Sequence, residues 1–281
     1  MSTSPPSTAP FEVARPNTVL SGERTGSGTP LVLLHGLTAT RRYVLHGSTA
    51  LARYGYGLVS YDARGHGTSL PAGPSERYHY DALGDDAAAV MTAQDIGRAV
   101  IVGQSMGSAT AINVALRHPD RVAGLVIITP AHRGAPSADL AHWDALADGL
   151  EAGGIDGFLA AYGPLSVPES MRVAATTVLR QRLARHLHPD GVVAALRGVP
   201  RSAAFDGLDA LAGIDVPTLI VASRDEMDPE HPAAVAEDYR LRIRNAAFVI
   251  EDPGQSPLAW RGGSLSRVIA QFLADHGGIR R

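Results

Sequence analysis

The stretch "IVGQSMGSA", Ile101 to Ala109, decides the fold class of this chain. An apolar run leads into residues 103–107, which have the spacing G-x-S-x-G, and a helix-forming stretch follows directly. Such a strand–turn–helix is so tight that only Gly103 and Gly107 let the two elements approach, with Ser105 strained at the tip. The serine hydroxyl then points out of the sheet at a helix N-terminus, where developing negative charge is favoured. The alternative is an ordinary glycine-rich turn between a strand and a helix.

Further apolar runs bounded by turn residues resemble the one before Ser105. They read "TPLVLLHG", "GYGLVSYDARG", "RVAGLVIITP", "VPTLIVASRD" and "AAFVIEDPG". Their Val, Ile and Leu residues lack polar alternation, as expected for strands buried on both faces. Helical patterns lie between them, for example at residues 81–96. This order predicts an α/β fold with a mostly parallel central sheet and helices on both faces.

The alternation of strands and helices stops between Ala131 and Phe205. Three helical patterns fill this segment, and the first is predicted to stop at Gly153-Gly154. A block of helices inserted between two strands predicts a cap over the strand ends, where ligands bind in such sheets. The predicted organisation is a disordered Ser-, Thr- and Pro-rich tail at 1–10, an α/β core at 11–130 and 206–281, and a helical cap at 131–205.

The composition of the 281 residues restricts the class of protein. Hydrophobic residues make up 45% and charged residues 19%, which is ordinary for a soluble globular protein. The net charge of -3 gives no reason to expect nucleic acid or an anionic membrane as a partner. Without cysteine, disulfides and thiolate chemistry are excluded. No signal peptide or membrane span is recognisable, so we expect a cytoplasmic protein that acts on a small molecule. The composition leaves its oligomeric state open.

With these landmarks in order, the chain resembles the α/β-hydrolase superfamily over nearly its whole length. "LVLLHGLTAT" is similar to the family's third strand and His-Gly turn, and "YDARGHGTS" to its D-x-R-G-x-G-x-S turn. The resemblance implies a nucleophile at Ser105 and an oxyanion hole made by the backbone N–H groups of Leu37 and Met106. It implies no cofactor and no metal, and the histidines show no metal-ligand spacing.

The same resemblance implies structural roles for three polar residues. His35, Asp62 and Arg64 hold loops in the family rather than react. Arg41 and Arg42, just after the oxyanion loop, could receive a substrate carboxylate, but a surface position is the favoured interpretation.

The acid of the family's triad follows the seventh strand, in a pattern like D-x-x-x-P. "VPTLIVASRDEMDPEHP" offers Asp225, with Pro229 four residues later. Asp228 is the competitor, but Asp225 lies closer to the strand end and is preferred. A solvated loop carboxylate is the alternative for either residue.

The catalytic histidine of the family follows the eighth strand, and here that position holds Gln255, in "VIEDPGQSPLAW". An amide cannot take the serine proton at neutral pH. Losing a triad member lowers kcat by orders of magnitude. The oxyanion hole and substrate binding nevertheless leave a rate ~10³–10⁴-fold above that of the uncatalysed reaction in water. If Gln255 fills a vacated histidine site, Gln255→His should raise esterase turnover on the order of 10²-fold or more.

Another histidine could replace the missing base. His132, just past the strand ending "VIITP", is the preferred candidate. His231, in "DPEHP", is expected in the first turn of the next helix. The remaining candidates have structural, surface or cap positions: His35, His46, His66, His118, His142, His186 and His188.

Three functions are compatible with these residues. The first, which we favour, is a serine hydrolase acting on a small apolar ester or related acyl compound with an altered triad. The second is a lyase, cyclase or isomerase in which Ser105 and Gln255 orient an enolate-like species by hydrogen bonds. The third is a binding protein without turnover. Retention of Ser105 and Asp225 favours the two enzymes, and the superfamily fold is compatible with all three.

Overall fold

The computed structural model describes residues 6–224, 230–255 and 260–280. At its centre lies an eight-stranded sheet in the order β1-β2-β4-β3-β5-β6-β7-β8. The strands are β1 (Thr8–Arg15), β2 (Thr18–Thr25), β3 (Thr29–Leu34), β4 (Tyr56–Tyr61), β5 (Ala99–Gln104), β6 (Val122–Ile128), β7 (Thr218–Ala222) and β8 (Ala247–Ile250). β2 pairs antiparallel with β1 and β4, whereas the other neighbouring strands run parallel. The predicted mostly parallel α/β sheet is therefore confirmed.

The hairpin of β1 and β2 at the sheet edge was not predicted from the sequence. β1 begins at Thr8, inside the segment 1–10 for which the composition predicts disorder. Its residues pair with β2 around a turn at Asn17, where φ is 70°. Backbone pairing depends little on side-chain chemistry, so it can order a Ser-, Thr- and Pro-rich segment. The prediction of disorder is therefore wrong for residues 8–10.

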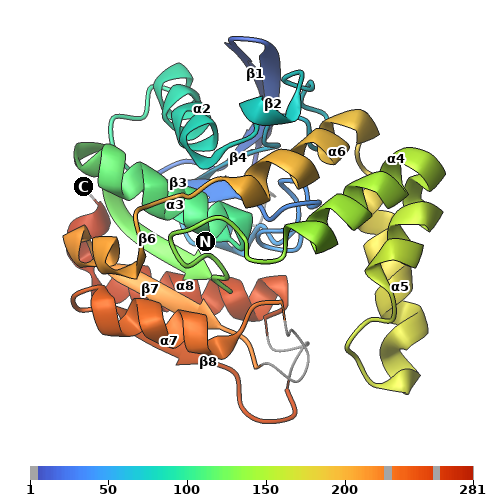
Figure 1. The fold of residues 1–281 in the computed structure, drawn as a ribbon. Coiled ribbons are helices and arrows are strands. Elements are labelled where there is room, and N and C mark those ends of the chain that lie inside the picture. Colours follow the sequence, from blue (N-terminus) through green and yellow to red (C-terminus); the bar gives the residue numbers. More distant parts are fainter. Residues whose placement is uncertain (1–5, 225–229, 256–259, 281) are drawn as a thin grey trace.

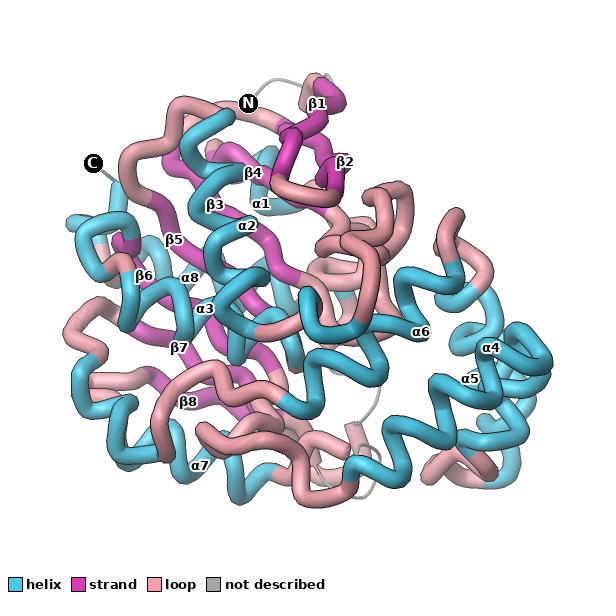
Figure 2. Tube along the Cα trace, turned by 45° about the horizontal axis from the view of Figure 1, so that its top comes forward, coloured by secondary structure: helices cyan, strands magenta, loops and turns pink. Residues whose placement is uncertain are grey.

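Helices cover both faces of the sheet (Figures 1 and 2). One face packs against α2 (Tyr80–Ala93), α3 (Met106–Arg117) and α7 (Ala233–Arg242), and the other against α1 (Ala50–Arg53) and α8 (Gly262–Asp275). Along β5, Ile101 belongs to the first core, and Val100 and Val102 belong to the second. Side chains of a strand alternate between faces, so a strand covered on both sides is apolar throughout.

Three helices lie between β6 and β7, where the sequence predicts the cap. They are α4 (Leu140–Tyr162), α5 (Glu169–Leu183) and α6 (Pro189–Gly198), and they project beyond one end of the sheet (Figure 1). They share a core of their own, which includes Leu146, Phe158, Leu183 and Leu196. The predicted stop at Gly153-Gly154 is a kink instead, with φ 58° and ψ -144° at Gly154. We call α4, α5 and α6 the inserted helices.

Short 3₁₀ turns complete the described secondary structure. They are Ser75–Arg77, Pro119–Arg121, Val199–Arg201, Leu208–Gly213 and Gly277–Arg280. None of the helices within the described ranges combines the length and the apolar character needed to cross a membrane.

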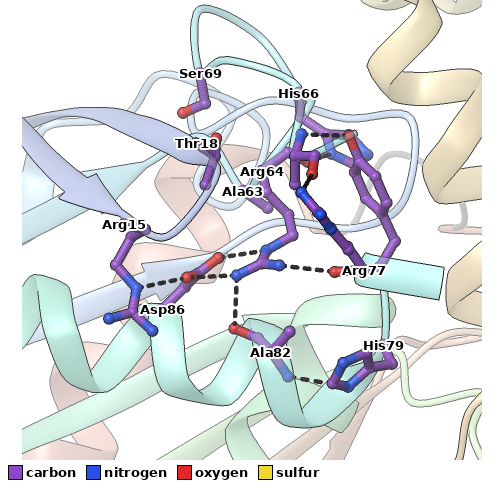
Figure 3. A network of polar contacts seen from close by, with 12 residues as sticks. Arg15, Thr18, Ala63, Arg64, His66, Ser69, Arg77, His79, Ala82 and Asp86 are labelled. Carbon is purple, nitrogen blue, oxygen red and sulfur yellow. Dashed lines mark hydrogen bonds and ion pairs between the residues drawn. The ribbon is translucent and has the colours of Figure 1, made fainter. Parts of the chain in front are cut away.

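A buried ion-pair network fixes the loop after β4 to the rest of the core (Figure 3). Asp86 on α2 accepts hydrogen bonds from Arg64 Nε and NH2, both at 2.8 Å, and from Arg15 Nε at 2.9 Å. Arg64 NH1 also donates to the carbonyl of Arg77 at 2.7 Å. Asp86 and Arg64 are 1% and 6% exposed, so the bidentate pair satisfies charges that water does not reach. Arg64 therefore anchors this loop, the structural role that the resemblance implies.

Candidate active site

Ser105 lies in the turn between β5 and α3, with φ 53° and ψ -115°. A positive φ is uncommon for a residue with a side chain and is found where the surroundings impose it. A Cβ on Gly103 would overlap the carbonyl oxygen of Gly107, and a Cβ on Gly107 would overlap that of Leu34. The turn is thus as tight as the sequence predicts, because glycine stands at both close approaches.

The backbone of Ser105 is held on both sides. Its N–H donates to the Ile128 carbonyl of β6 at 3.1 Å. Its carbonyl accepts from the Ser108 hydroxyl at 2.6 Å and from the Ser108 amide at 2.9 Å. These bonds fix the serine at the carboxyl end of the parallel strands.

The Ser105 hydroxyl is hydrogen-bonded to His231, with Nε2 and Oγ 2.8 Å apart. The prediction that His231 lies in the first turn of the next helix is wrong, because α7 begins at Ala233. A residue before proline is driven from helical to extended backbone, so Pro232 keeps His231 outside α7. The imidazole therefore reaches the serine from the loop after β7.

His132, the candidate preferred from the sequence, has a different position. Its Nε2 accepts a hydrogen bond from the Ala204 amide at 2.9 Å. Its ring packs against Tyr80 and Phe205, with centroids 4.9 and 5.1 Å away. Burial lowers the pKa of His132 to about 4, so it is neutral near pH 7. His132 thus holds the segment that follows the inserted helices, and the preference for it as the base is corrected.

Gln255 is exposed, and its backbone N–H donates to the Asp252 carbonyl at 3.1 Å, closing the turn after β8. Within the described ranges, Ser105 Oγ makes its side-chain hydrogen bond with His231 rather than with Gln255. Asp225, its competitor Asp228 and the following Pro229 lie outside the described residues.

Glu251, which was not predicted from the sequence, joins the ends of β7 and β8. It is 3% exposed. Its Oε1 accepts from the Ser223 hydroxyl at 3.0 Å and from the Arg224 amide at 2.6 Å, while Arg224 Nε donates to the Glu251 carbonyl at 2.8 Å. Glu251 therefore fixes the point where the loop leading to His231 begins. A carboxylate directly after the apolar "AFVI" was the signal that could have revealed it.

The turn after β3 brings backbone amides near the serine. Gly36 lies close to the serine, since a Cβ there would make a tight contact of 3.3 Å with Ser105 Cβ and an ordinary one of 3.8 Å with Oγ. The Gly36 carbonyl accepts from His35 Nδ1 at 2.8 Å and from the Ala39 amide at 3.0 Å. In a trans peptide C=O and N–H point in opposite directions, so the Leu37 N–H points away from these partners. Met106 is the first residue of α3, where amides have no acceptor within the helix.

His35 and Asp62 hold the loops around this turn. His35 Nε2 accepts from the Ala63 amide at 2.9 Å, and burial lowers its pKa. Asp62 accepts from the Arg41 amide at 2.8 Å, from the Thr68 amide at 2.9 Å and from the Arg41 guanidinium. The Arg41 charge is thus already paired, and Arg42 is exposed. These contacts support a structural role for Arg41 over carboxylate binding.

The arrangement suits proton transfer from a hydroxyl to an imidazole. A neutral imidazole nitrogen within hydrogen-bond reach can accept the serine proton as the oxygen attacks a carbonyl. The N-terminus of α3 favours the negative charge that develops there. Among the residues that the structure describes, no group of three or more His, Cys, Asp or Glu side chains could hold a metal ion.

Comparison with known proteins places residues 29–214 in a family described as "alpha/beta hydrolase fold". The chain is 29% identical to "Putative carbamate hydrolase RutD" from Agrobacterium fabrum over 211 residues, 73% of this chain and 78% of that protein. It is 35% identical to "Putative non-heme haloperoxidase" from Mycobacterium phage D29, but over only 38% of this chain and 37% of that protein. An esterase structure from Thermogutta terrifontis superposes with a TM-score of 0.79 at 24% identity, covering 97% of this chain and all of that one, which shows a shared fold.

Proposed function

Because the chain belongs to the α/β-hydrolase fold family, we propose that it is a serine hydrolase acting on a small apolar ester or related acyl compound. Ser105 is the nucleophile in this proposal, and His231, rather than the residue at position 255, is its base. The observation that carries the proposal is the 2.8 Å distance between His231 Nε2 and Ser105 Oγ.

The proposed reaction has two half-steps. His231 takes the Ser105 proton while Oγ attacks the substrate carbonyl, and the amides of Leu37 and Met106 stabilise the oxyanion. The imidazolium then gives its proton to the leaving alcohol, and an acyl-enzyme remains. Water, deprotonated by the same imidazole, attacks the acyl carbon, and the imidazolium gives this proton to Ser105 Oγ as the bond between Oγ and the acyl group breaks and the carboxylic acid leaves.

Asp225 remains our proposal for the carboxylate that orients His231. It directly follows Arg224, whose amide is held by Glu251 at 2.6 Å. It is also six residues before His231, so one loop would carry both the acid and the base. In the family pattern they come from two separate loops.

The non-hydrolytic and binding-protein alternatives started from the absence of a base. A histidine at hydrogen-bond distance from Ser105 removes that reason. Gln255, which is exposed, is proposed to have no direct part in proton transfer. We therefore retain the hydrolase as the proposed function.

Hydrolysis of p-nitrophenyl acetate and butyrate by four purified variants tests this proposal. Ser105→Ala and His231→Ala are each expected to lower kcat by about 10³-fold or more, since the triad members act as a unit. Gln255→Ala and His132→Gln are the matched controls and should keep kcat within about threefold, with circular dichroism spectra reporting the fold of all four. Full activity of His231→Ala would refute the assigned base, and the absence of any Ser105-dependent hydrolysis would refute the hydrolase itself.

A further inference from the structure

The turn that carries Leu37 contains a strained residue. The Gly36 carbonyl accepts from the Ala39 amide at 3.0 Å, which makes residues 36–39 a β-turn with Leu37 and Thr38 at its centre. Thr38 has φ 63°, the positive value that the third position of a type II turn requires. Glycine or asparagine ordinarily occupies that position, and a β-branched residue there is strained. Other contacts must therefore hold Thr38.

Those contacts come from the inserted helices. His186, just after α5, donates from Nε2 to the Thr38 carbonyl at 2.9 Å. Arg182 on α5 donates from NH2 to the Thr38 hydroxyl at 3.0 Å. Two residues separated from Thr38 by more than 140 positions thus bind both of its oxygen atoms.

The other side of His186 is tied to the loop after β4. Its Nδ1 accepts from the Gly67 amide at 2.8 Å, and the Leu187 amide donates to the Gly67 carbonyl at 2.8 Å. A neutral imidazole carrying its proton on Nε2 is required to donate to Thr38 and accept from Gly67 at once. The imidazole therefore bridges two core loops in one protonation state.

We propose that His186 is a positioning residue that holds the Thr38 turn, and with it the Leu37 amide, in the conformation needed for the oxyanion hole. The inference rests on the proposed function. Its physical basis is that the two hydrogen bonds to Thr38 offset the strain of its positive φ. The Leu37 side chain also packs against the core of the inserted helices. The inserted helices thus hold this turn both by the hydrogen bonds to Thr38 and by apolar contact with Leu37.

The surroundings of His186 favour the neutral ring. Burial lowers its pKa to about 4, although the bond to the Thr38 carbonyl and the charge of Asp62 act in the opposite direction. His35, His66 and Arg182 also face it, and the ring centroid of His66 is 5.6 Å away. At pH 6–8 the bridge between Thr38 and Gly67 is consequently intact.

The test compares His186→Phe with His186→Gln and with His188→Phe, a matched control in the same segment. His186→Phe should lower kcat for p-nitrophenyl butyrate by about 10- to 100-fold with KM within about twofold, since misplacing an oxyanion donor acts on the transition state. The affinity for a trifluoromethyl ketone, whose adduct with Ser105 carries an oxyanion, should fall by the same factor. His186→Gln retains a donor for Thr38 and should keep most of the activity, and His188→Phe should match the wild type.

A second substitution separates positioning from general stability. Glycine adopts a positive φ without strain, so Thr38→Gly in the His186→Phe background should recover part of the lost kcat. If His186→Phe does not fold, Arg182→Met takes its place and should lower kcat about threefold to tenfold at unchanged KM. Unchanged kcat and inhibitor affinity in the folded variant would overturn the inference while leaving the proposed function intact. Failure of Ser105→Ala to abolish hydrolysis would overturn the proposed function instead.

Discussion

Positions 231 and 255 follow neighbouring parallel strands, so the loops that contain them start from the same edge of the sheet. A base can reach Ser105 from either loop, because the carboxyl ends of parallel strands converge there. In this chain the imidazole comes from the loop after β7, and the residue after β8 is an exposed glutamine. The loop after β7 thus supplies the hydrogen bond that the proposed chemistry requires.

This arrangement changes the expected effect of Gln255→His. With His231 bonded to Ser105, we expect kcat for p-nitrophenyl butyrate at pH 7.5 to change by less than about threefold. The double variant His231→Ala/Gln255→His should stay as inactive as His231→Ala alone, because the side chain at position 255 is exposed. A gain on the order of 10², as the sequence alone predicts, would return the base to position 255.

Among the elements, His132 joins two segments of the chain. It lies in the segment that follows β6 and binds Ala204 in the segment that follows the inserted helices. This ring accepts a backbone N–H at 2.9 Å and packs between two aromatic rings, so it is needed as the neutral form. His186 makes a similar demand at the end of α5. These two contacts thus depend on uncharged imidazole.

His132 and His186 contribute to the pH dependence of stability, together with the buried His35 and His66, whose pKa values burial also lowers. Burial lowers the pKa values of His132 and His186 to about 4, against 6.5 in the unfolded chain, so the unfolded state binds more protons between these values. Stability should be full above pH ~6.5 and fall as the pH drops toward 4, by at most about 1.4 kcal/mol per pH unit for each histidine. Urea unfolding from pH 4.5 to 7.5 measures the slope, which His132→Gln should reduce and His132→Gln/His186→Gln should reduce further. An unchanged slope in the double variant would contradict this origin.

For the whole molecule, Asp86 joins three segments that are far apart in the sequence. It lies on α2 and binds Arg15 at the end of β1 and Arg64 in the loop after β4 (Figure 3). That loop also carries Gly67, which meets the inserted helices through His186. The hairpin, the core and the inserted helices are connected through this one region.

Removing the Asp86 charge should therefore destabilise the entire fold. Asp86→Asn leaves the Arg64 charge buried without its partner, which typically costs about 3–5 kcal/mol. The neighbouring pair of Asp85 and Arg117 is partly exposed, with side chains 45% and 37% accessible, so Asp85→Asn should cost about 1 kcal/mol or less. Urea unfolding of both variants measures the difference, and equal losses would show that Asp86 has no special role.

The resemblance to the family implied the loop-holding roles of His35 and Asp62, whereas the sequence by itself determined the parallel strands and the Ser105 turn. These features depend on local chemistry, namely apolar runs at every strand position and glycines at close approaches. The edge hairpin was missed because β1 is mostly exposed and lacks a buried apolar run. Only the tertiary structure decided that His231 meets Ser105, that Glu251 joins β7 to β8, and that His186 holds Thr38. Each of these contacts joins segments from 27 to 148 residues apart, and neither periodicity nor motif spacing encodes which way a loop side chain turns once the strand ends meet.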